Sequence, residues 1–215
     1  MRDDVMLIGP LLAGKTSVAL YLSATLGLPN YPLDKLKWYY RLKNGYNLAR
    51  GVHIRQSAGF GAHLEYARRF FSLSDLADCL ARFRGGIIDF GASHSVFDDP
   101  EQLAAAKAIL SLFRNVMLVM PSPDINEAAE ILGERIRNRY RFSDLSDAII
   151  ESYVEMNRRF IVSESNRCLA RYCIYTREKT VEDVGDEIAS LAGYESRSPR
   201  RAAERTAWGG CQGSN

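Results

Sequence analysis

The chain has 215 residues, which suits one α/β domain rather than several. Hydrophobic residues make up 47% and charged residues 25%, with a formal net charge of +2, so the composition is that of a soluble globular protein and argues against nucleic acid or a membrane surface as the main partner. No apolar run could span a bilayer, there is no room for a signal peptide before the first strand, and the cysteines lack metal-type spacing. We therefore expect a cytoplasmic protein with reduced thiols.

The first predicted strand, residues 5–8, leads into the segment GPLLAGKT. This segment has the required glycines, lysine and threonine at every fixed position of the phosphate-binding motif G-x-x-x-x-G-K-[ST]. Glycines let backbone N–H groups wrap a phosphate, and the helix predicted over residues 17–26 directs its positive end at the same anion. A plain glycine turn between strand and helix is the alternative, and the complete motif in this context favours the phosphate site.

Two side chains of this loop have separate expected tasks. Lys15 is expected to be exposed and to reach the outer phosphates of ATP, while the Thr16 hydroxyl ligates Mg²⁺. The expected nucleotide-binding residues of the loop are Gly9, Pro10, Leu11, Leu12, Ala13, Gly14, Lys15, Thr16 and Ser17.

Beyond the first helix, strands alternate with helices. Further strands are predicted over residues 31–34, 87–90, 116–120 and 172–175, and further helices over residues 35–43, 62–71, 73–84, 100–113, 124–137, 144–163 and 181–191. Residues 46–61 are predicted to be a glycine-rich connection. The alternation predicts a parallel sheet with helices on both faces over residues 1–193. Residues 194–215, polar, basic and finally glycine-rich, are predicted to be a disordered tail.

Two aspartates are candidates for catalysis because each closes a predicted strand. Asp34 lies after the second strand, at the sheet edge where α/β proteins bind ligands, although it could instead cap the following helix. Asp89 ends the apolar strand Ile87-Ile88-Asp89, where a carboxylate of a P-loop protein reaches Mg²⁺ through water. A carboxylate capping the next turn is the alternative for Asp89.

Four arginines lie within seven residues after the fourth strand, at positions 135, 137, 139 and 141. Phosphoryl transfer needs positive charge over the equatorial oxygens, and an arginine-rich lid supplies it while excluding water. A solvated helix end, whose cations complement the helix dipole, is the alternative. His94, after the third strand, could contact an acceptor, although a loop histidine more often has no chemical role.

From Val5 to Leu191 the order of these parts resembles the shikimate kinases, which belong to the P-loop proteins related to nucleoside monophosphate kinases. The shared parts are the phosphate loop, a helix ending in LGL, an aspartate after strand two, a glycine turn after strand three, an arginine-rich lid and a short last strand. The resemblance implies a three-layer P-loop fold with a five-stranded parallel sheet. It also implies an acceptor-binding insertion at about residues 34–72 and a lid at about residues 134–147.

The resemblance implies roles at the acceptor. Asp34 would hold the acceptor's hydroxyl groups and accept the proton, and Gly91 would border the acceptor. Arg69 and Arg158 match the arginines that bind the carboxylate of the family's substrate.

It implies roles at the nucleotide as well. Lys15 and a lid arginine would neutralise the transferring phosphoryl group. The lid arginine would be one of Arg135, Arg137 and Arg139, and we assign Arg139 to catalysis and Arg135 to nucleotide binding. Thr176 and Lys179 would lie on the adenine-side loop, and Asp89 would join Thr16 at the metal.

The chain departs from the family's pattern where the acceptor and the metal bind. Pro32 replaces the first aspartate of Asp-x-Asp, Gly91-Ala92-Ser93 replaces three glycines, and Ser72 lies nearest to the position of an expected glutamate. The sequence therefore predicts a kinase, dependent on ATP and Mg²⁺, whose small-molecule acceptor is not shikimate. A monomer or weak dimer is expected. Two alternatives stay open: a nucleotide-binding regulatory module without phosphotransfer, and a nucleoside or nucleotide kinase.

Overall fold

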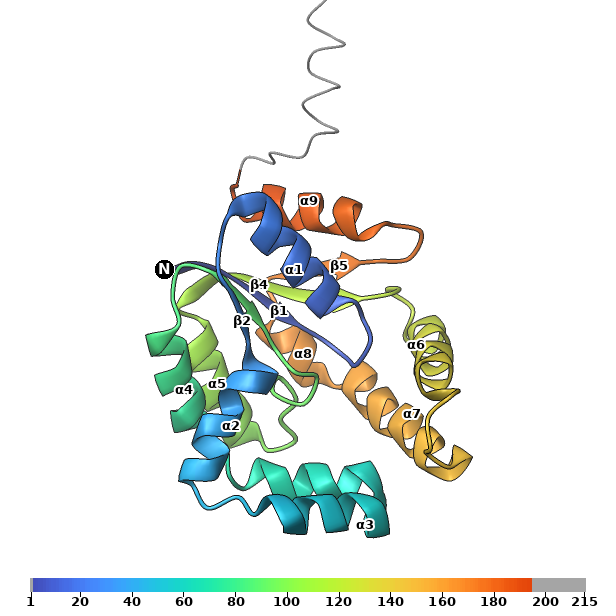
Figure 1. Cartoon of the computed structure of the whole chain (residues 1–215). Coiled ribbons are helices and arrows are strands. Elements are labelled where there is room, and N and C mark those ends of the chain that lie inside the picture. Colours follow the sequence, from blue (N-terminus) through green and yellow to red (C-terminus); the bar gives the residue numbers. More distant parts are fainter. Residues whose placement is uncertain (1, 195–215) are drawn as a thin grey trace, which may run out of the picture.

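The computed structural model describes residues 2–194, which form a central sheet with helices on both sides (Figure 1). Its strands are β1 (Arg2–Ile8), β2 (Asn30–Pro32), β3 (Ile87–Asp89), β4 (Phe113–Met120) and β5 (Tyr172–Tyr175). They pair in the order β2-β3-β1-β4-β5, and every pair is parallel. The predicted five-stranded parallel α/β sheet is confirmed. Residues 195–215 of the predicted tail lie outside the described residues.

The middle of the sheet is the core of the domain. The β1 run Val5–Ile8 is completely buried, and the last five residues of β4 are buried beside it. Strands covered on both faces need such continuous apolar runs, because neither face meets water. Residues 2–194 contain no helix with the length and hydropathy that crossing a membrane requires.

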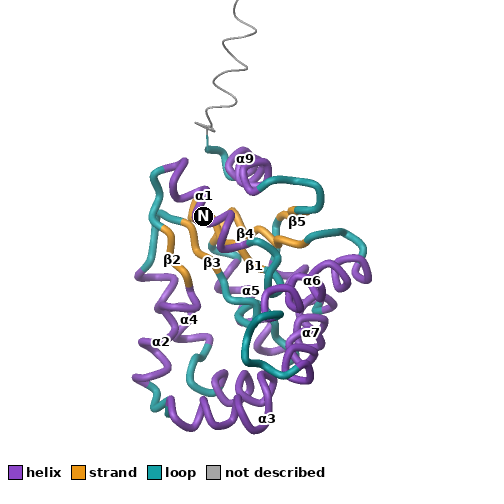
Figure 2. Tube along the Cα trace, turned by 45° about the vertical axis from the view of Figure 1, so that its right-hand side comes forward, coloured by secondary structure: helices purple, strands orange, loops and turns teal. Residues whose placement is uncertain are grey.

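The helices form two layers and a third group at the edge of the sheet. They are α1 (Lys15–Leu26), α2 (Leu33–Lys43), α3 (Leu48–Arg68), α4 (Leu73–Arg82), α5 (Pro100–Leu110), α6 (Ile125–Tyr140), α7 (Asp147–Val162), α8 (Glu164–Leu169) and α9 (Val181–Leu191). α1 and α9 pack together on one face, and α4, α5 and α8 cover the other (Figures 1 and 2). α3, α6 and α7 lie beyond the sheet, where α7 contacts both of the others.

The predicted connection over residues 46–61 is wrong, because α3 occupies most of it. Asn47 caps this helix by accepting a hydrogen bond from the Arg50 amide. At Gly51 a Cβ atom would overlap the Tyr46 ring, so this glycine serves close packing rather than a turn. Only Gly59, with φ 83°, breaks the helical path and kinks it. The glycine content of this segment therefore led to a wrong prediction, because close packing stabilises a helix there.

Asp34 also lies in a different element from the one predicted. β2 ends at Pro32, and Asp34 is in the first turn of α2 rather than at the end of a strand. Carboxylates are favourable in a first helical turn, where they face the positive end of the helix dipole. α8 was not predicted from the sequence. In the structure it is separated from α7 by Ser163, whose backbone is extended.

Candidate functional site

The phosphate loop joins β1 to α1 at the carboxyl edge of the sheet. Gly9 (φ 134°) and Gly14 (φ 102°) are in conformations that other residues rarely adopt, and a Cβ on Gly9 would overlap the Val119 carbonyl oxygen. Leu12 has φ 60°, a left-handed conformation that costs a non-glycine residue ~1–2 kcal/mol. No side chain caps the amino end of α1. This end is therefore open to an anion that accepts from its N–H groups.

Lys15 is buried, with 7% of its surface exposed, so the expected exposed loop lysine is wrong. Its ammonium donates to the carbonyl oxygens of Gly9 (2.9 Å) and Pro10 (2.8 Å). Burial lowers the pKa of Lys15 to about 8, against the opposing charges of Asp89 and Asp34, which raise it. The ammonium is thus held beside the cradle by groups that phosphate oxygens can replace.

Thr16 and Asp89 meet directly. The Thr16 hydroxyl donates to a carboxylate oxygen of Asp89 at 2.7 Å, and Asp89 is only 5% exposed. Burial raises the pKa of Asp89, although Thr16 and Lys15 lower it in part. In the sheet register Asp89 is the partner of Pro32 on β2, the residue that stands where the resemblance to the shikimate kinases led us to expect an aspartate.

These two oxygens fit a magnesium ion. Mg²⁺ prefers hard oxygen ligands and is commonly held by one or two protein groups together with substrate phosphates and water. Within residues 2–194 no cluster of three or more His, Cys, Asp or Glu side chains could hold a metal ion on its own. A magnesium site on Thr16 and Asp89 would therefore depend on the nucleotide.

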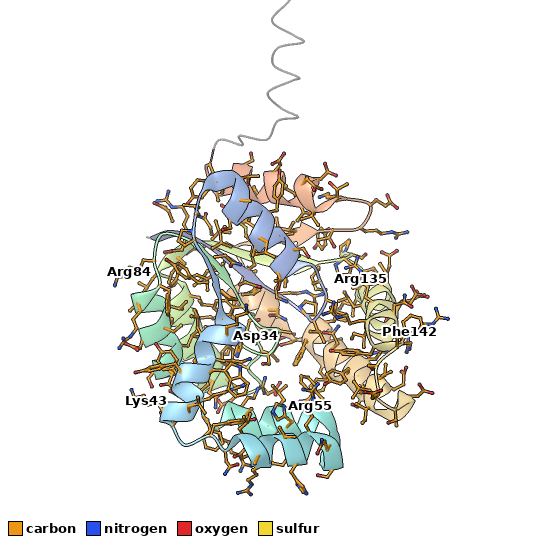
Figure 3. All side chains as sticks on the ribbon, viewed as in Figure 1. Asp34, Lys43, Arg55, Arg84, Arg135 and Phe142 are labelled. Atoms are coloured by element: carbon orange, nitrogen blue, oxygen red, sulfur yellow. The ribbon has the colours of Figure 1, made fainter. Side chains whose placement is uncertain are left out.

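Asp34 lies near the centre of the molecule (Figure 3) and packs against Gly91. A Cβ on Gly91 would overlap the Asp34 carboxylate, so only glycine permits this approach. Asp34 forms an ion pair with Lys37, one turn along α2. Burial raises the pKa of Asp34, but Lys37, His94 and Lys15 outweigh it and leave the pKa below its usual value. Its side chain is 62% exposed even though protein groups surround it, so the ionised carboxylate is accessible to a ligand.

The three arginines that we expected in a lid differ in their contacts. Arg135 donates to the carbonyl oxygen of Leu12 in the phosphate loop at 3.1 Å. Arg137 forms a two-pronged ion pair with Glu151 of α7, at 2.6 and 2.9 Å. Arg139 is exposed and has no hydrogen bond or ion pair within the described residues. Arg135 is thus the one that the structure brings to the phosphate loop.

A buried asparagine fixes the same loop from α7. The Asn157 amide accepts from the Leu11 N–H at 2.7 Å and donates to the Leu11 carbonyl at 3.1 Å, with 1% of the residue exposed. Sequence reasoning missed Asn157, because no local pattern indicates that a residue 146 positions away pairs with the loop.

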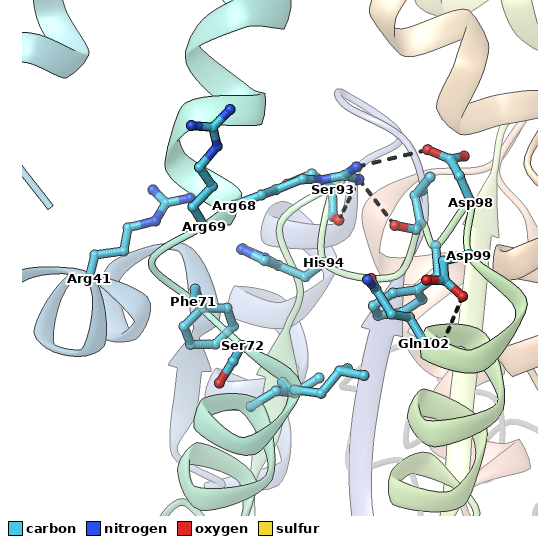
Figure 4. Close-up of a pocket in the computed structure, with 14 residues that line it drawn as sticks. Arg41, Arg68, Arg69, Phe71, Ser72, Ser93, His94, Asp98, Asp99 and Gln102 are labelled. Carbon is cyan, nitrogen blue, oxygen red and sulfur yellow. Dashed lines mark hydrogen bonds and ion pairs between the residues drawn. The ribbon is translucent and has the colours of Figure 1, made fainter. Parts of the chain in front are cut away.

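Of the two expected acceptor arginines, one lines a pocket and the other does not. Arg69, which follows α3 as its C-cap residue, lines a pocket of about 600 Å³ between α2, α4 and α5 (Figure 4). Arg158 is exposed on α7 and does not line this pocket. Arg41 and His94, in contrast, both line it.

The adenine-side loop follows β5 beside the end of β4. The Thr176 amide donates to the Met120 carbonyl (2.9 Å), and the Arg177 amide donates to the Pro121 carbonyl (3.0 Å). The Thr176 hydroxyl is buried without a hydrogen-bond partner in the described structure, and Lys179 pairs with Glu187 at 2.7 Å. This loop therefore lies at the same edge of the sheet as the phosphate loop.

Lys37 and Arg41 also belong to the site and were missed from the sequence. They follow Asp34 at the spacings i+3 and i+7, which place all three on one face of a helix. That spacing was the available signal, and predicting Asp34 outside the helix concealed it.

The fold is similar to that of solved shikimate kinases. The chain matches no family model, and no curated protein sequence resembles it significantly. Shikimate kinase from Acinetobacter baumannii, in complex with shikimate, matches with a TM-score of 0.55 and 18% identity over 89% of this chain and 93% of that one. The shikimate kinase from Bacteroides thetaiotaomicron gives a TM-score of 0.49 at 17% identity, covering 88% of this chain and 98% of that one. The match to the Acinetobacter enzyme confirms that this chain has the α/β fold of a shikimate kinase.

Proposed function

We propose that the chain is a cytoplasmic kinase that transfers the γ-phosphoryl group of ATP to a hydroxyl of a small molecule other than shikimate. One observation carries the proposal: Lys15, the Thr16–Asp89 pair and Asp34 converge at one edge of the sheet. The charges of Asp34 and Asp89 both act on Lys15. A phosphate cradle and an accessible carboxylate for an acceptor are thereby combined in one site.

The residues divide the reaction between them. Lys15, released from the loop carbonyls, would bind the outer phosphates, and the open end of α1 would bind the phosphate within the loop. Asp34 would accept a hydrogen bond from the acceptor hydroxyl and take its proton. The new bond joins the acceptor oxygen to the γ-phosphorus, the bond to the β–γ bridging oxygen breaks, and ADP leaves.

Two further groups support charge neutralisation. A bound Mg²⁺ would supply positive charge at the phosphate oxygens, and Thr16 with Asp89 would hold it. Of the lid arginines, Arg135 is our candidate for contact with the phosphoryl group, because it already reaches the loop carbonyl of Leu12. Arg139 would need the lid to move before it could take the catalytic role that the family resemblance suggests.

The test is a phosphotransfer assay with labelled ATP, Mg²⁺ and a panel of small hydroxylated metabolites, read by mass spectrometry. We expect one class of acceptor to gain a phosphoryl group, and we expect shikimate to be poor because the acceptor site lacks groups that the family uses. Saturable transfer to shikimate at ordinary kinase rates of about 1–100 s⁻¹ would overturn the acceptor assignment.

A nucleotide-binding module without transfer is the second candidate, and Pro32 beside Asp89 is the observation that favours it. The two candidates differ in one measurement. A module binds ATP with Mg²⁺ but yields no phosphorylated product from any acceptor, whereas a kinase yields product that disappears in Asp34→Asn.

A further inference from the structure

Arg41 is a buried cation without a polar partner. Only 4% of its surface is exposed, and the structure of residues 2–194 gives its guanidinium no hydrogen bond or ion pair. Its guanidinium carbon lies 5.4 Å from the centroid of the Trp38 ring and 5.8 Å from that of the Tyr46 ring. These rings stabilise a cation in part, but a desolvated guanidinium is strongly unfavourable unless an anion and hydrogen bonds accompany it.

Arg41 faces a cavity that could hold such an anion. The pocket of about 600 Å³ is within the size range of small-molecule sites. Figure 4 shows Arg41 and His94 directed toward the same space, while the Arg69 side chain begins beside it and its guanidinium extends away. Both ring nitrogens of His94 are buried without a hydrogen-bond partner, so a neutral imidazole there has one donor and one acceptor to offer.

The other charged groups of the pocket are already engaged. Arg68 turns away, donating to the Ser93 and Val96 carbonyls and pairing with Asp98 at 4.0 Å. Asp99 caps α5 by accepting from the Glu101 amide at 2.8 Å. Within residues 2–194 neither carboxylate forms an ion pair with Arg41. The charge of Asp34 raises the pKa of Arg41, but burial outweighs it and leaves that pKa below its usual value. The rest of the lining includes an apolar wall made of Phe71, Leu73, Leu76 and Phe97.

The pocket adjoins the candidate catalytic carboxylate. Asp34 and Arg41 are seven residues apart on α2, which places their Cα atoms ~10 Å apart along one face of the helix. The His94 amide donates to the carbonyl of Gly91 at 3.0 Å, and Gly91 is the residue against which Asp34 packs. A molecule of moderate size can therefore reach both the Asp34 carboxylate and the Arg41 guanidinium.

We infer that this pocket binds the acceptor, and that Arg41 selects an acceptor with an anionic group and an apolar body. The anionic group, a carboxylate or a phosphate, lies on Arg41 with His94 and Arg69 beside it, and the apolar body lies against the phenylalanine and leucine wall. The inference rests on the proposed kinase function, because it assigns the reactive hydroxyl to Asp34. A neutral analogue would leave Arg41 unpaired, so the site discriminates by charge.

The probes are benzoate, phenyl phosphate and neutral benzamide, which share an aryl body and differ in charge. Their binding to the full chain is measured by calorimetry and by NMR of the three imidazoles, with the His94 signal assigned through His94→Gln. Saturating ADP with Mg²⁺ occupies the phosphate loop, and a parallel set omits it. We expect at least one anion to bind and to shift the His94 signal, while benzamide binds at least about tenfold more weakly.

Arg41→Met preserves the length of the buried stem and removes the charge. We expect it to weaken binding of the anions at least about tenfold, without lowering the melting temperature of the ligand-free protein. Lys43→Met, two residues further along α2 and directed away from the pocket (Figure 3), is the matched control and should leave binding unchanged. The stronger of the two anions indicates whether the natural group is a carboxylate or a phosphate.

Three results would overturn the inference. One is equal binding of benzamide and the anions, and another is no binding of either anion at about 10 mM. The third is anion binding that survives Arg41→Met. If Arg41→Met does not fold, Arg41→Gln and the wild-type comparison of charged with neutral probes decide. Because nucleotide binding is scored separately, loss of the kinase proposal and loss of this pocket assignment are distinguishable.

Discussion

The candidate site has a nucleotide end, at the phosphate loop and Asp89, and an acceptor end, at Asp34 and the pocket beside it. The polar groups of the two ends differ in their hydrogen bonding. At the phosphate loop of the nucleotide end the polar side chains have protein partners: Lys15 bonds the loop carbonyls, Thr16 bonds Asp89, and Asn157 bonds Leu11. At the acceptor end Arg41 and the ring nitrogens of His94 have none in the described structure. The difference is what we expect if the two ends bind the ligands that we propose. Backbone carbonyls of the phosphate loop accept hydrogen bonds from Lys15 when no phosphate is bound. Arg41 and His94 have no such substitute acceptor or donor in the described structure.

From the same difference we expect the phosphate loop to be the more stable of the two ends without ligand. Unpaired buried charge is costly, so the acceptor end depends on neighbouring rings and packing to hold Arg41 in place. The buried cation of the nucleotide end, Lys15, is instead paired with two loop carbonyls. We therefore expect substitutions at the nucleotide end to change ligand binding, and substitutions of acceptor-end cations to change ligand choice.

The largest effect is expected from Asp34→Asn, which separates the two ends. The carboxylate should orient and deprotonate the acceptor, and loss of a general base lowers turnover ~10²–10⁴-fold. ATP affinity should change far less than turnover, because within residues 2–194 no hydrogen bond or ion pair joins Asp34 to the phosphate loop, although its charge acts on Lys15. Product formation is followed by mass spectrometry and ATP binding by calorimetry. A parallel loss of ATP affinity would place Asp34 at the nucleotide instead.

Lys15→Met should break the nucleotide end. Removing a charge aimed at the transferring phosphates lowers turnover ~10²–10³-fold and weakens ATP binding. The fold should persist with an unchanged or higher melting temperature, because a desolvated cation is removed. Lys107→Met, on the exposed surface of α5, is the matched control and should behave as wild type. Unchanged ATP affinity in Lys15→Met would contradict the phosphate site.

The fold and the nucleotide end could be predicted because local rules determine both. Apolar runs between turn residues indicated all five strands, and the predicted bounds of β5 and α9 agree with the structure. The phosphate motif is specific because only glycine tolerates the backbone of Gly9 and Gly14. Asn157 could not be predicted, since its role depends on where α7 packs rather than on its sequence neighbours.

The acceptor end was predicted less well because helix α3 and the start of α2 were misread. Asp34 was placed in a strand, which hid the helical face shared with Lys37 and Arg41. Whether an arginine is buried and unpaired is a tertiary property, and no local pattern carries it. The family resemblance pointed to Arg158, which does not line the pocket here.

Asp89→Asn tests whether the nucleotide end contains a metal site. It retains a hydrogen-bond acceptor for Thr16 but removes the negative charge near the metal. We expect the Mg²⁺ concentration needed for half-maximal ATP binding or turnover to rise about tenfold to a hundredfold. Loss of a group that orients metal ligands usually has an effect of that size. Titration of Mg²⁺ at fixed ATP measures it. If the Mg²⁺ dependence does not change, Asp89 only caps the turn after β3.

The smallest effect concerns pH and isolates Lys15 without a mutation. Its pKa is about 8 without ligand, and ATP phosphates should raise it, so binding above pH 8 must take up a proton. Affinity should be constant between about pH 7.5 and 8, where the phosphates are already ionised, and then fall up to about tenfold per pH unit.

The stability of the ligand-free protein should change in the opposite direction. The unfolded lysine has the ordinary pKa of 10.5, so the unfolded state binds more protons between about pH 8 and 10.5, and this contribution to stability rises across that window. Calorimetric titrations with ATP and thermal melts from pH 7.5 to 10 measure both trends. Lys15→Met should remove the contribution of Lys15 to the second trend, and Lys107→Met should retain it. If ATP affinity is equal at pH 7.5 and 9.5, the phosphates do not bind a lysine with a lowered pKa. A different cation would then have to bind the phosphates at the nucleotide end.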